Sequence, residues 1–168
     1  MPILVNFLPC IVVVLDAFTN RVSAFSILDS VQPSAQITPA VGTTDPSGDS
    51  EQAHLLIGPI QVLSHWRAEE GDHGQQFEQR ILLRAPGGGA AILQPPAAFA
   101  LERPFHRMML QVPILAVPVP GTYQLVLQLR RSGETEWTIV KEYPLLVQEI
   151  PTEQETEQAI EFAPSVSE

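Results

Sequence analysis

The sequence predicts an all-β fold, namely an antiparallel β-sandwich of immunoglobulin-like or similar type with seven or eight strands and a disordered acidic C-terminal tail. Short β-rich runs alternate with turn residues from residue 8 to residue 148, at the spacing typical of a sandwich. No stretch shows a sustained helical apolar period. The 16 prolines and the low charged fraction of 17% also disfavour a helical bundle, because proline breaks helix interiors. We therefore expect a sandwich domain over residues 1–148 and a tail over residues 149–168.

The first predicted strand is the apolar segment of residues 8–15. Its Val and Ile content is typical of a strand that is buried on both faces. The wider apolar run of residues 3–15 has no basic region before it and is interrupted by Asn6 and Pro9. It is also shorter than the ~20 residues that a membrane span needs. We interpret it as a buried strand and expect no membrane span, a signal or anchor segment being the alternative.

The second predicted strand covers residues 21–31 and follows the turn residues 16–20, so that the two strands form a hairpin. Phe25, Ile27 and Val31 are expected to share one face of it. Residues 32–53 then form a long proline- and glycine-containing loop, with a short strand near Ile37. Structureless loops of this length are uncommon in compact domains and are often functional.

The middle of the chain contains three predicted strands. The strand of residues 54–66 is expected to bend or bulge at Gly58-Pro59, where proline removes a ladder donor. In residues 77–84 apolar and charged side chains alternate, which indicates a half-buried strand. After a turn at residues 85–89, the segment 90–101 contains Pro95-Pro96 and is expected to be an edge strand or an extended connection.

The last part of the domain contains three more predicted strands. Residues 105–119 form one of them, partly at an edge because it contains prolines. Residues 123–130 alternate most strictly, with only Val126 breaking the pattern, so that one face should lie in the core and the other in water. In the final strand, residues 135–148, five residues are expected to share one face: Trp137, Ile139, Tyr143, Leu145 and Val147.

The net charge of −10 comes largely from the tail. From Glu149 to the end there are six acidic residues and no basic ones, whereas residues 1–148 carry 13 acidic and 9 basic groups. Low apolar content predicts that the tail is disordered, with residues 159–162 as its only apolar patch. Nucleic-acid binding is disfavoured because no basic face is visible.

Several short motifs, taken in order, resemble a family of small, uncharacterised bacterial β-sandwich proteins, a domain-of-unknown-function family. The motifs are a Cys-bearing first strand, Thr19-Asn20-Arg21, Val22-Ser23-Ala24-Phe25, Phe105-His106-Arg107, Pro120-Gly121-Thr122-Tyr123 and Tyr143-Pro144-Leu145. The resemblance covers residues 8–148. It implies the sandwich fold and a bacterial source, and it carries no catalytic residues to transfer.

Two residue groups are candidate binding sites. Arg103, His106 and Arg107 form a basic cluster around Phe105 that could bind an anion or an acidic partner, the alternative being exposed charges on a strand. His65, Glu69, Asp72 and His73 lie on or beside one polar loop, and histidine with carboxylate can bind zinc or manganese. The spacing lacks a compact ligand pair, so the alternative is a solvated acidic loop.

Catalytic motifs and cofactor motifs are not found in the sequence. The single cysteine, Cys10, lies within an apolar strand and is expected to be a buried, inert thiol; its lack of a partner fits a reducing cytoplasm. We therefore expect a non-catalytic, cytoplasmic module without a cofactor that interacts with an unknown protein partner or serves as a scaffold. The alternative is a sandwich that binds a small molecule or metal through the 65–73 loop. An exposed edge strand would also allow homo-oligomerisation.

Overall fold

The computed structural model describes residues 1–16, 21–37 and 54–149, and these ranges contain twelve β-strands and no helix. No membrane-spanning helix is therefore present in the described ranges. The strands are β1 (Ile3–Asp16), β2 (Arg21–Ile27), β3 (Ser30–Val31), β4 (Ala35–Ile37), β5 (His54–Ile57), β6 (Ile60–Arg67), β7 (Gln76–Arg84), β8 (Ala90–Ala100), β9 (Phe105–Val112), β10 (Leu115–Val117), β11 (Gly121–Arg131) and β12 (Thr138–Val147). The predicted tail and most of the predicted 32–53 loop lie outside the described residues.

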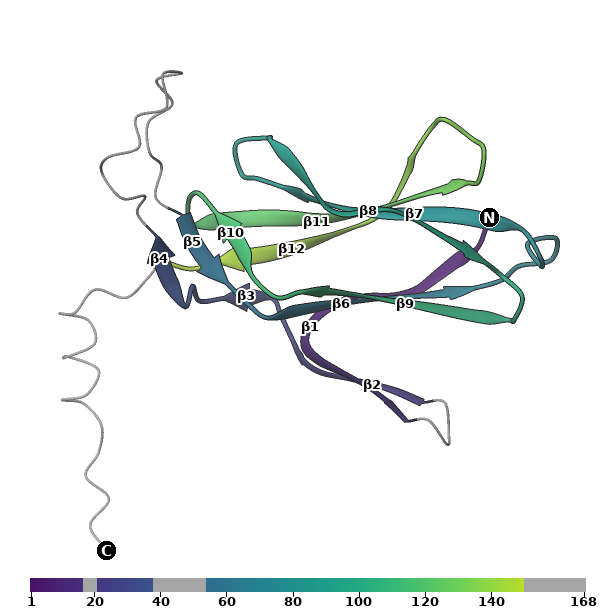
Figure 1. Cartoon of the computed structure of the whole chain (residues 1–168), viewed down its shortest axis with the longest axis horizontal. Coiled ribbons are helices and arrows are strands. Elements are labelled where there is room, and N and C mark those ends of the chain that lie inside the picture. Colours follow the sequence, from purple (N-terminus) through teal and green to yellow (C-terminus); the bar gives the residue numbers. More distant parts are fainter. Residues whose placement is uncertain (17–20, 38–53, 150–168) are drawn as a thin grey trace, which may run out of the picture.

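Two sheets face each other as the layers of a sandwich (Figure 1). The first has the strand order β2-β1-β6-β9, and the second has the order β3-β12-β11-β7-β8. Every neighbouring pair is antiparallel except β3 and β12, which are parallel. The orders β1-β6-β9 and β12-β11-β7-β8 correspond to the A-B-E and G-F-C-C′ sheets of immunoglobulin-type sandwiches. The predicted antiparallel sandwich is confirmed.

Strand β11 shows why this sequence folds as a sandwich. On one face of β11, Tyr123, Leu125, Leu127 and Leu129 are all buried in the core between the sheets. The prediction that its other face lies in water is wrong in the middle of the strand, because Val126 and Gln128 are buried as well and Arg80 donates a 2.6 Å hydrogen bond to Gln128 there. Burying one such leucine side chain contributes ~1.5–3 kcal/mol. The facing layer supplies Ile60, Val62 and Trp66 from β6 to the same core.

The predicted bend at Gly58-Pro59 is confirmed, and it separates β5 from β6. Beside it, the neighbouring strand is interrupted between β9 and β10. The backbone of Gly58 lies so close to Pro113 that a Cβ at this position would overlap the Pro113 carbonyl oxygen. The sheet continues past this break as β10-β5-β4, the small third sheet.

The start of β11 is fixed by a tyrosine corner. Tyr123 is buried, and its hydroxyl donates a hydrogen bond of 2.8 Å to the carbonyl oxygen of Val119, four residues upstream. In immunoglobulin-type sandwiches the same contact closes the connection that leads into the corresponding strand. The Pro-Gly-Thr-Tyr sequence therefore carries out the role that its turn chemistry predicts.

The prediction for the final strand is wrong for two of its five residues. Tyr143 is partly buried against the core, and Leu145 and Val147 lie within the core. A register shift in β12, opposite Leu127 and Gln128 of β11, turns the residues of β12 that precede the shift to the other face. Ile139 is therefore half exposed, and the Trp137 ring contacts the guanidinium groups of Arg80 and Arg130, each 4.3 Å from its centre. An extra residue at a bulge reverses the alternation of side chains, and such bulges leave little trace in sequence.

The first two predicted strands also need correction. Segment 8–15 is not buried on both faces, because Ile11, Val12 and Val14 are exposed. Val31 does not share a strand with Phe25, because β2 ends at residue 27 and Val31 lies in β3 of the other sheet. The apolar composition of this region therefore marks an uncovered surface of the described protein, which sequence periodicity cannot distinguish from a core.

A polar cluster crosses the interior between the two layers. Gln79 of β7 is buried, and its Oε1 accepts hydrogen bonds of 2.9 Å from Ser64 Oγ and from Trp66 Nε1, both on β6. Its Nε2 donates to Gln94 of β8 at 3.1 Å. Buried polar groups that are hydrogen-bonded in this way avoid a large desolvation penalty and favour one alignment of the two sheets.

Candidate functional site

The hairpin of β1 and β2 projects away from the two layers of the sandwich (Figure 1). Val12 and Phe25 are directly opposite each other in the ladder, and Val14 lies two residues further along. These three side chains, called the hairpin patch below, have exposed fractions of 42–54%. At the base of the hairpin, Ile11 and Ile27 are similarly exposed. Clustered exposed apolar residues of this kind mark interaction sites more often than scattered ones do.

The free edge of β2 has few of the features that discourage pairing with another chain. Strand β3 is only two residues long, and β8 contains Pro95 and Pro96. Strand β9 carries His106 and Arg107. Short length, proline and charge all discourage pairing with another chain. Strand β2 has none of these features apart from Arg21 at its start.

A cleft of about 400 Å³ lies between the hairpin and the outer face of the four-stranded sheet. The lining residues of this hairpin cleft are Asn6, Leu8, Val22, Ala24, Ile27, Leu63, His65 and Arg107. Successive residues of a strand point to opposite faces, so Val22 and Ala24 face the cleft while Phe25 faces away from it. The hairpin thus has an apolar surface on both of its faces.

Electrostatics in the hairpin cleft depend on His65 and Arg107, which are register partners in β6 and β9. Burial, with the Arg107 charge as a second cause, lowers the pKa of His65 below its ordinary value. The imidazole is therefore neutral at neutral pH. Its ring packs against Phe105 with centroids 5.3 Å apart, and its Nε2 atom is buried without a hydrogen-bond partner.

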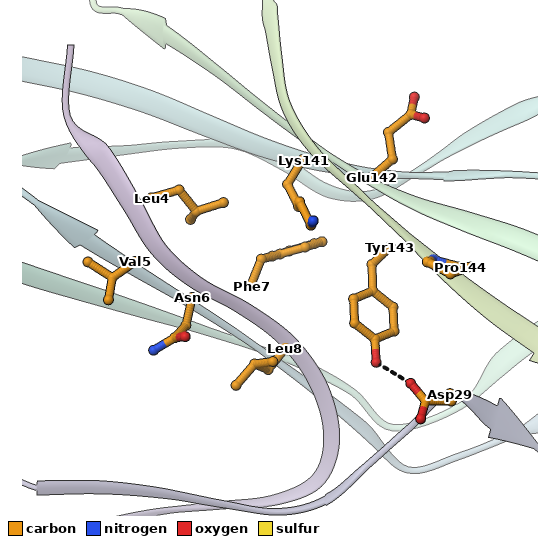
Figure 2. Close-up of a pocket in the computed structure, with 10 residues that line it drawn as sticks. All are labelled: Leu4, Val5, Asn6, Phe7, Leu8, Asp29, Lys141, Glu142, Tyr143 and Pro144. Carbon is orange, nitrogen blue, oxygen red and sulfur yellow. Dashed lines mark hydrogen bonds between the residues drawn. The ribbon is translucent and has the colours of Figure 1, made fainter.

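A second groove, of about 500 Å³, lies between β1 and β12 (Figure 2). Here Tyr143 donates a 2.6 Å hydrogen bond to Asp29 Oδ1. Burial, the hydrogen bond and the Asp29 charge raise the pKa of Tyr143 to about 12. A tyrosine that holds its proton so firmly is a poor general base, and its contact instead connects β12 to the segment that precedes β3.

The structure divides the predicted basic cluster. His106 faces inward and stacks on Phe99, with ring centroids 4.7 Å apart, and together with Arg103 it lines a shallow pocket of about 410 Å³. Arg107 points to the opposite side of β9 and lines the hairpin cleft. Burial lowers the pKa of His106, so this pocket gains little positive charge from it at neutral pH.

The predicted metal-binding residues are not brought together. His65 lines the hairpin cleft, whereas Glu69 and His73 are exposed on their loop. Asp72 is buried and accepts a 3.2 Å hydrogen bond from the Glu69 backbone, with its other oxygen 3.4 Å from the Met1 amino group. Among the residues that the structure describes, no group of three or more His, Cys, Asp and Glu side chains could hold a metal ion.

Neither the pairing of His65 with Arg107 nor the exposure of the hairpin patch was predictable from residue spacing alone. The first depends on the register between β6 and β9, which only the fold provides. The sequence carries one sign of the exposed hairpin patch, because an apolar segment interrupted by Asn6 and Pro9 is unusual for a central strand.

No protein-family model, curated protein or solved structure matches the chain. The resemblance to a family of bacterial sandwich proteins therefore stays a prediction.

Proposed function

We propose that this protein is a non-catalytic interaction module that binds a partner protein through the β1–β2 hairpin. The exposure of the hairpin patch is the observation that carries the proposal. Burial of these apolar side chains by a partner contributes ~25 cal/mol of binding free energy for each Å² removed from water. The partner supplies an extended segment that adds to the free edge of β2.

Backbone chemistry supports this mode of binding. An edge strand presents unpaired N–H and C=O groups, and an extended peptide satisfies them by continuing the ladder. Because β2 pairs only with β1 among the described strands, one side of its ladder is available within that part of the chain. Alternate side chains of the partner would lie beside Phe25, with Val12 one strand further across the same face. A second copy of this chain could supply such a segment through its own β2.

The side chains that could act in catalysis are buried or held in structural hydrogen bonds, which favours a binding role over an enzymatic one. Cys10 is fully buried, and burial raises its pKa, so the reactive thiolate is disfavoured. Tyr143 and Asp72 are engaged in the contacts described above. The geometry of the 65–73 loop gives the metal-binding alternative no support of its own.

Photo-crosslinking tests the proposal. A benzophenone amino acid replaces Phe25 in the full chain, and the matched control carries it at Ile92, which is 60% exposed on the opposite sheet. We expect a discrete crosslinked product from position 25 that the additional change Val12→Lys abolishes. Equal labelling from both positions, or none from position 25, would contradict the proposal. A product of twice the chain mass would identify the partner as a second copy.

A further inference from the structure

The floor of the hairpin cleft is made of two adjacent rows that differ in chemistry. One row crosses the sheet as Asn6, His65 and Arg107, which are register partners on β1, β6 and β9. The next row, two residues along each strand, contains Leu8 and Leu63, likewise paired. All five residues line the cleft. A polar end and an apolar end thus lie side by side.

The remaining walls extend the apolar end. Val22, Ala24 and Ile27 of β2 cover it from the hairpin side. The volume of about 400 Å³ falls within the range of ~300–1,000 Å³ that is typical of small-molecule sites. Such sites combine mostly apolar walls with a few polar groups that orient the ligand. The hairpin cleft combines both kinds of group, with five apolar and three polar residues among those that line it.

The polar row favours an anion over a cation or a neutral group. Arg107 contributes a permanent positive charge, and none of the described residues that line the cleft carries a carboxylate. His65, the register partner of Arg107, places an imidazole in the same row, and a ring N–H can donate a hydrogen bond to an anion. A planar carboxylate matches the geometry of a guanidinium, and it can also accept from an imidazole and from the Asn6 amide.

We propose that the hairpin cleft is a binding site for a small organic carboxylate with an apolar body. The carboxylate lies at the row of Asn6, His65 and Arg107, and the body lies over Leu8 and Leu63 beneath the hairpin. This site is separate from the proposed partner-binding surface, because the hairpin patch lies on the other face of the hairpin. If the carboxylate site were shown not to exist, the proposed binding of a partner through β2 would be unaffected.

Calorimetric titration of the full chain with octanoate tests the site. We expect saturable binding at one site per chain, with octanol and octylamine each binding at least ~10-fold more weakly, since a charge-assisted hydrogen bond is worth roughly one such factor or more. Arg107→Gln should weaken octanoate binding by a similar factor. The matched control, Arg103→Gln, changes an arginine of the separate shallow pocket and should leave binding unchanged.

Two further measurements separate binding from general loss of structure. Ala24→Leu narrows the apolar end and should reduce octanoate affinity while the melting temperature stays close to that of the parent. By nuclear magnetic resonance, bound octanoate should raise the apparent pKa of His65, because a nearby anion favours the imidazolium. The proposal is overturned if octanoate does not saturate, if octanol binds equally well, if Arg107→Gln has no effect, or if only an acidic peptide binds.

Discussion

Trp66 Nε1 donates a 2.9 Å hydrogen bond to Gln79 Oε1 across the interior of the sandwich. The same oxygen accepts from Ser64, so one buried amide connects β6 to β7 of the facing sheet. The immunoglobulin domains of antibodies connect their two layers with a disulfide. The described part of this chain has one cysteine, and a hydrogen-bonded glutamine spans the layers instead.

Gln79→Leu should lower the free energy of unfolding by about 2–4 kcal/mol, because two buried donors lose their acceptor and each costs ~1–3 kcal/mol. Urea unfolding followed by tryptophan fluorescence measures the effect. The matched control is Gln94→Leu, whose side chain is only half-buried at the edge strand and should cost ~1 kcal/mol. Adding Ser64→Ala to Gln79→Leu should recover stability, and a fully additive loss would contradict the account.

Gly58→Ala should destabilise the protein by about 1–3 kcal/mol, because the new Cβ overlaps the Pro113 carbonyl oxygen and the backbone must move. Thermal unfolding provides the measurement. Gly87→Ala is the matched control, since a Cβ there meets open space, and it should change stability by less than ~0.5 kcal/mol. Equal effects at the two glycines would show that backbone entropy, rather than the close approach, determines the cost.

Stability should fall with rising pH between about 10 and 12 because of Tyr143. Its pKa is raised to about 12 in the folded protein, above the ~10 of an unfolded chain. The unfolded state therefore loses this proton first, so the contribution is complete below pH ~10 and is lost as pH approaches 12. Comparison of urea unfolding at pH 9 and pH 11 for the parent and Tyr143→Phe isolates the effect. A slope that persists unchanged in the variant would assign it to another group.

Cys10 should not react with a thiol reagent in the native protein. Its side chain is fully buried and its pKa is raised by burial, so both access and thiolate formation are suppressed. Labelling with Ellman's reagent at pH 8 should follow the rate of unfolding and become immediate in 6 M guanidinium. Rapid stoichiometric labelling under native conditions would show that β1 opens locally without global unfolding.

The sequence predicts strands well where a period of two is unbroken and one face is buried. The alternation in β7 and the proline-blunted edge at β8 follow from side-chain chemistry along the strand itself. In β11 only the inward face follows in this way, because Val126 and Gln128 on the other face are buried as well. The tyrosine corner and the break at Gly58-Pro59 follow from turn residues whose backbone preferences are local.

Features that depend on contacts between distant strands were not predictable. The faces of Trp137 and Ile139 depend on a bulge opposite Leu127, and a one-residue slip moves every side chain before it to the other face. His106 and Arg107 are adjacent in sequence, so their separation could have been expected from alternation. The pairing of Arg107 with His65, by contrast, required the register of β6 and β9.

Strand β1 has neighbours that become available at very different times during synthesis. Residues 17–59 separate the end of β1 from the start of β6, whereas β2 begins five residues after β1 ends. At a translation rate of ~5–20 residues per second, β1 waits seconds for its neighbour in the sheet, and an unpaired apolar strand is prone to aggregation in that interval. By pairing within microseconds of emerging, β2 can shield the nascent strand until β6 arrives. The hairpin would then protect the nascent chain from aggregation before it binds a partner in the folded protein.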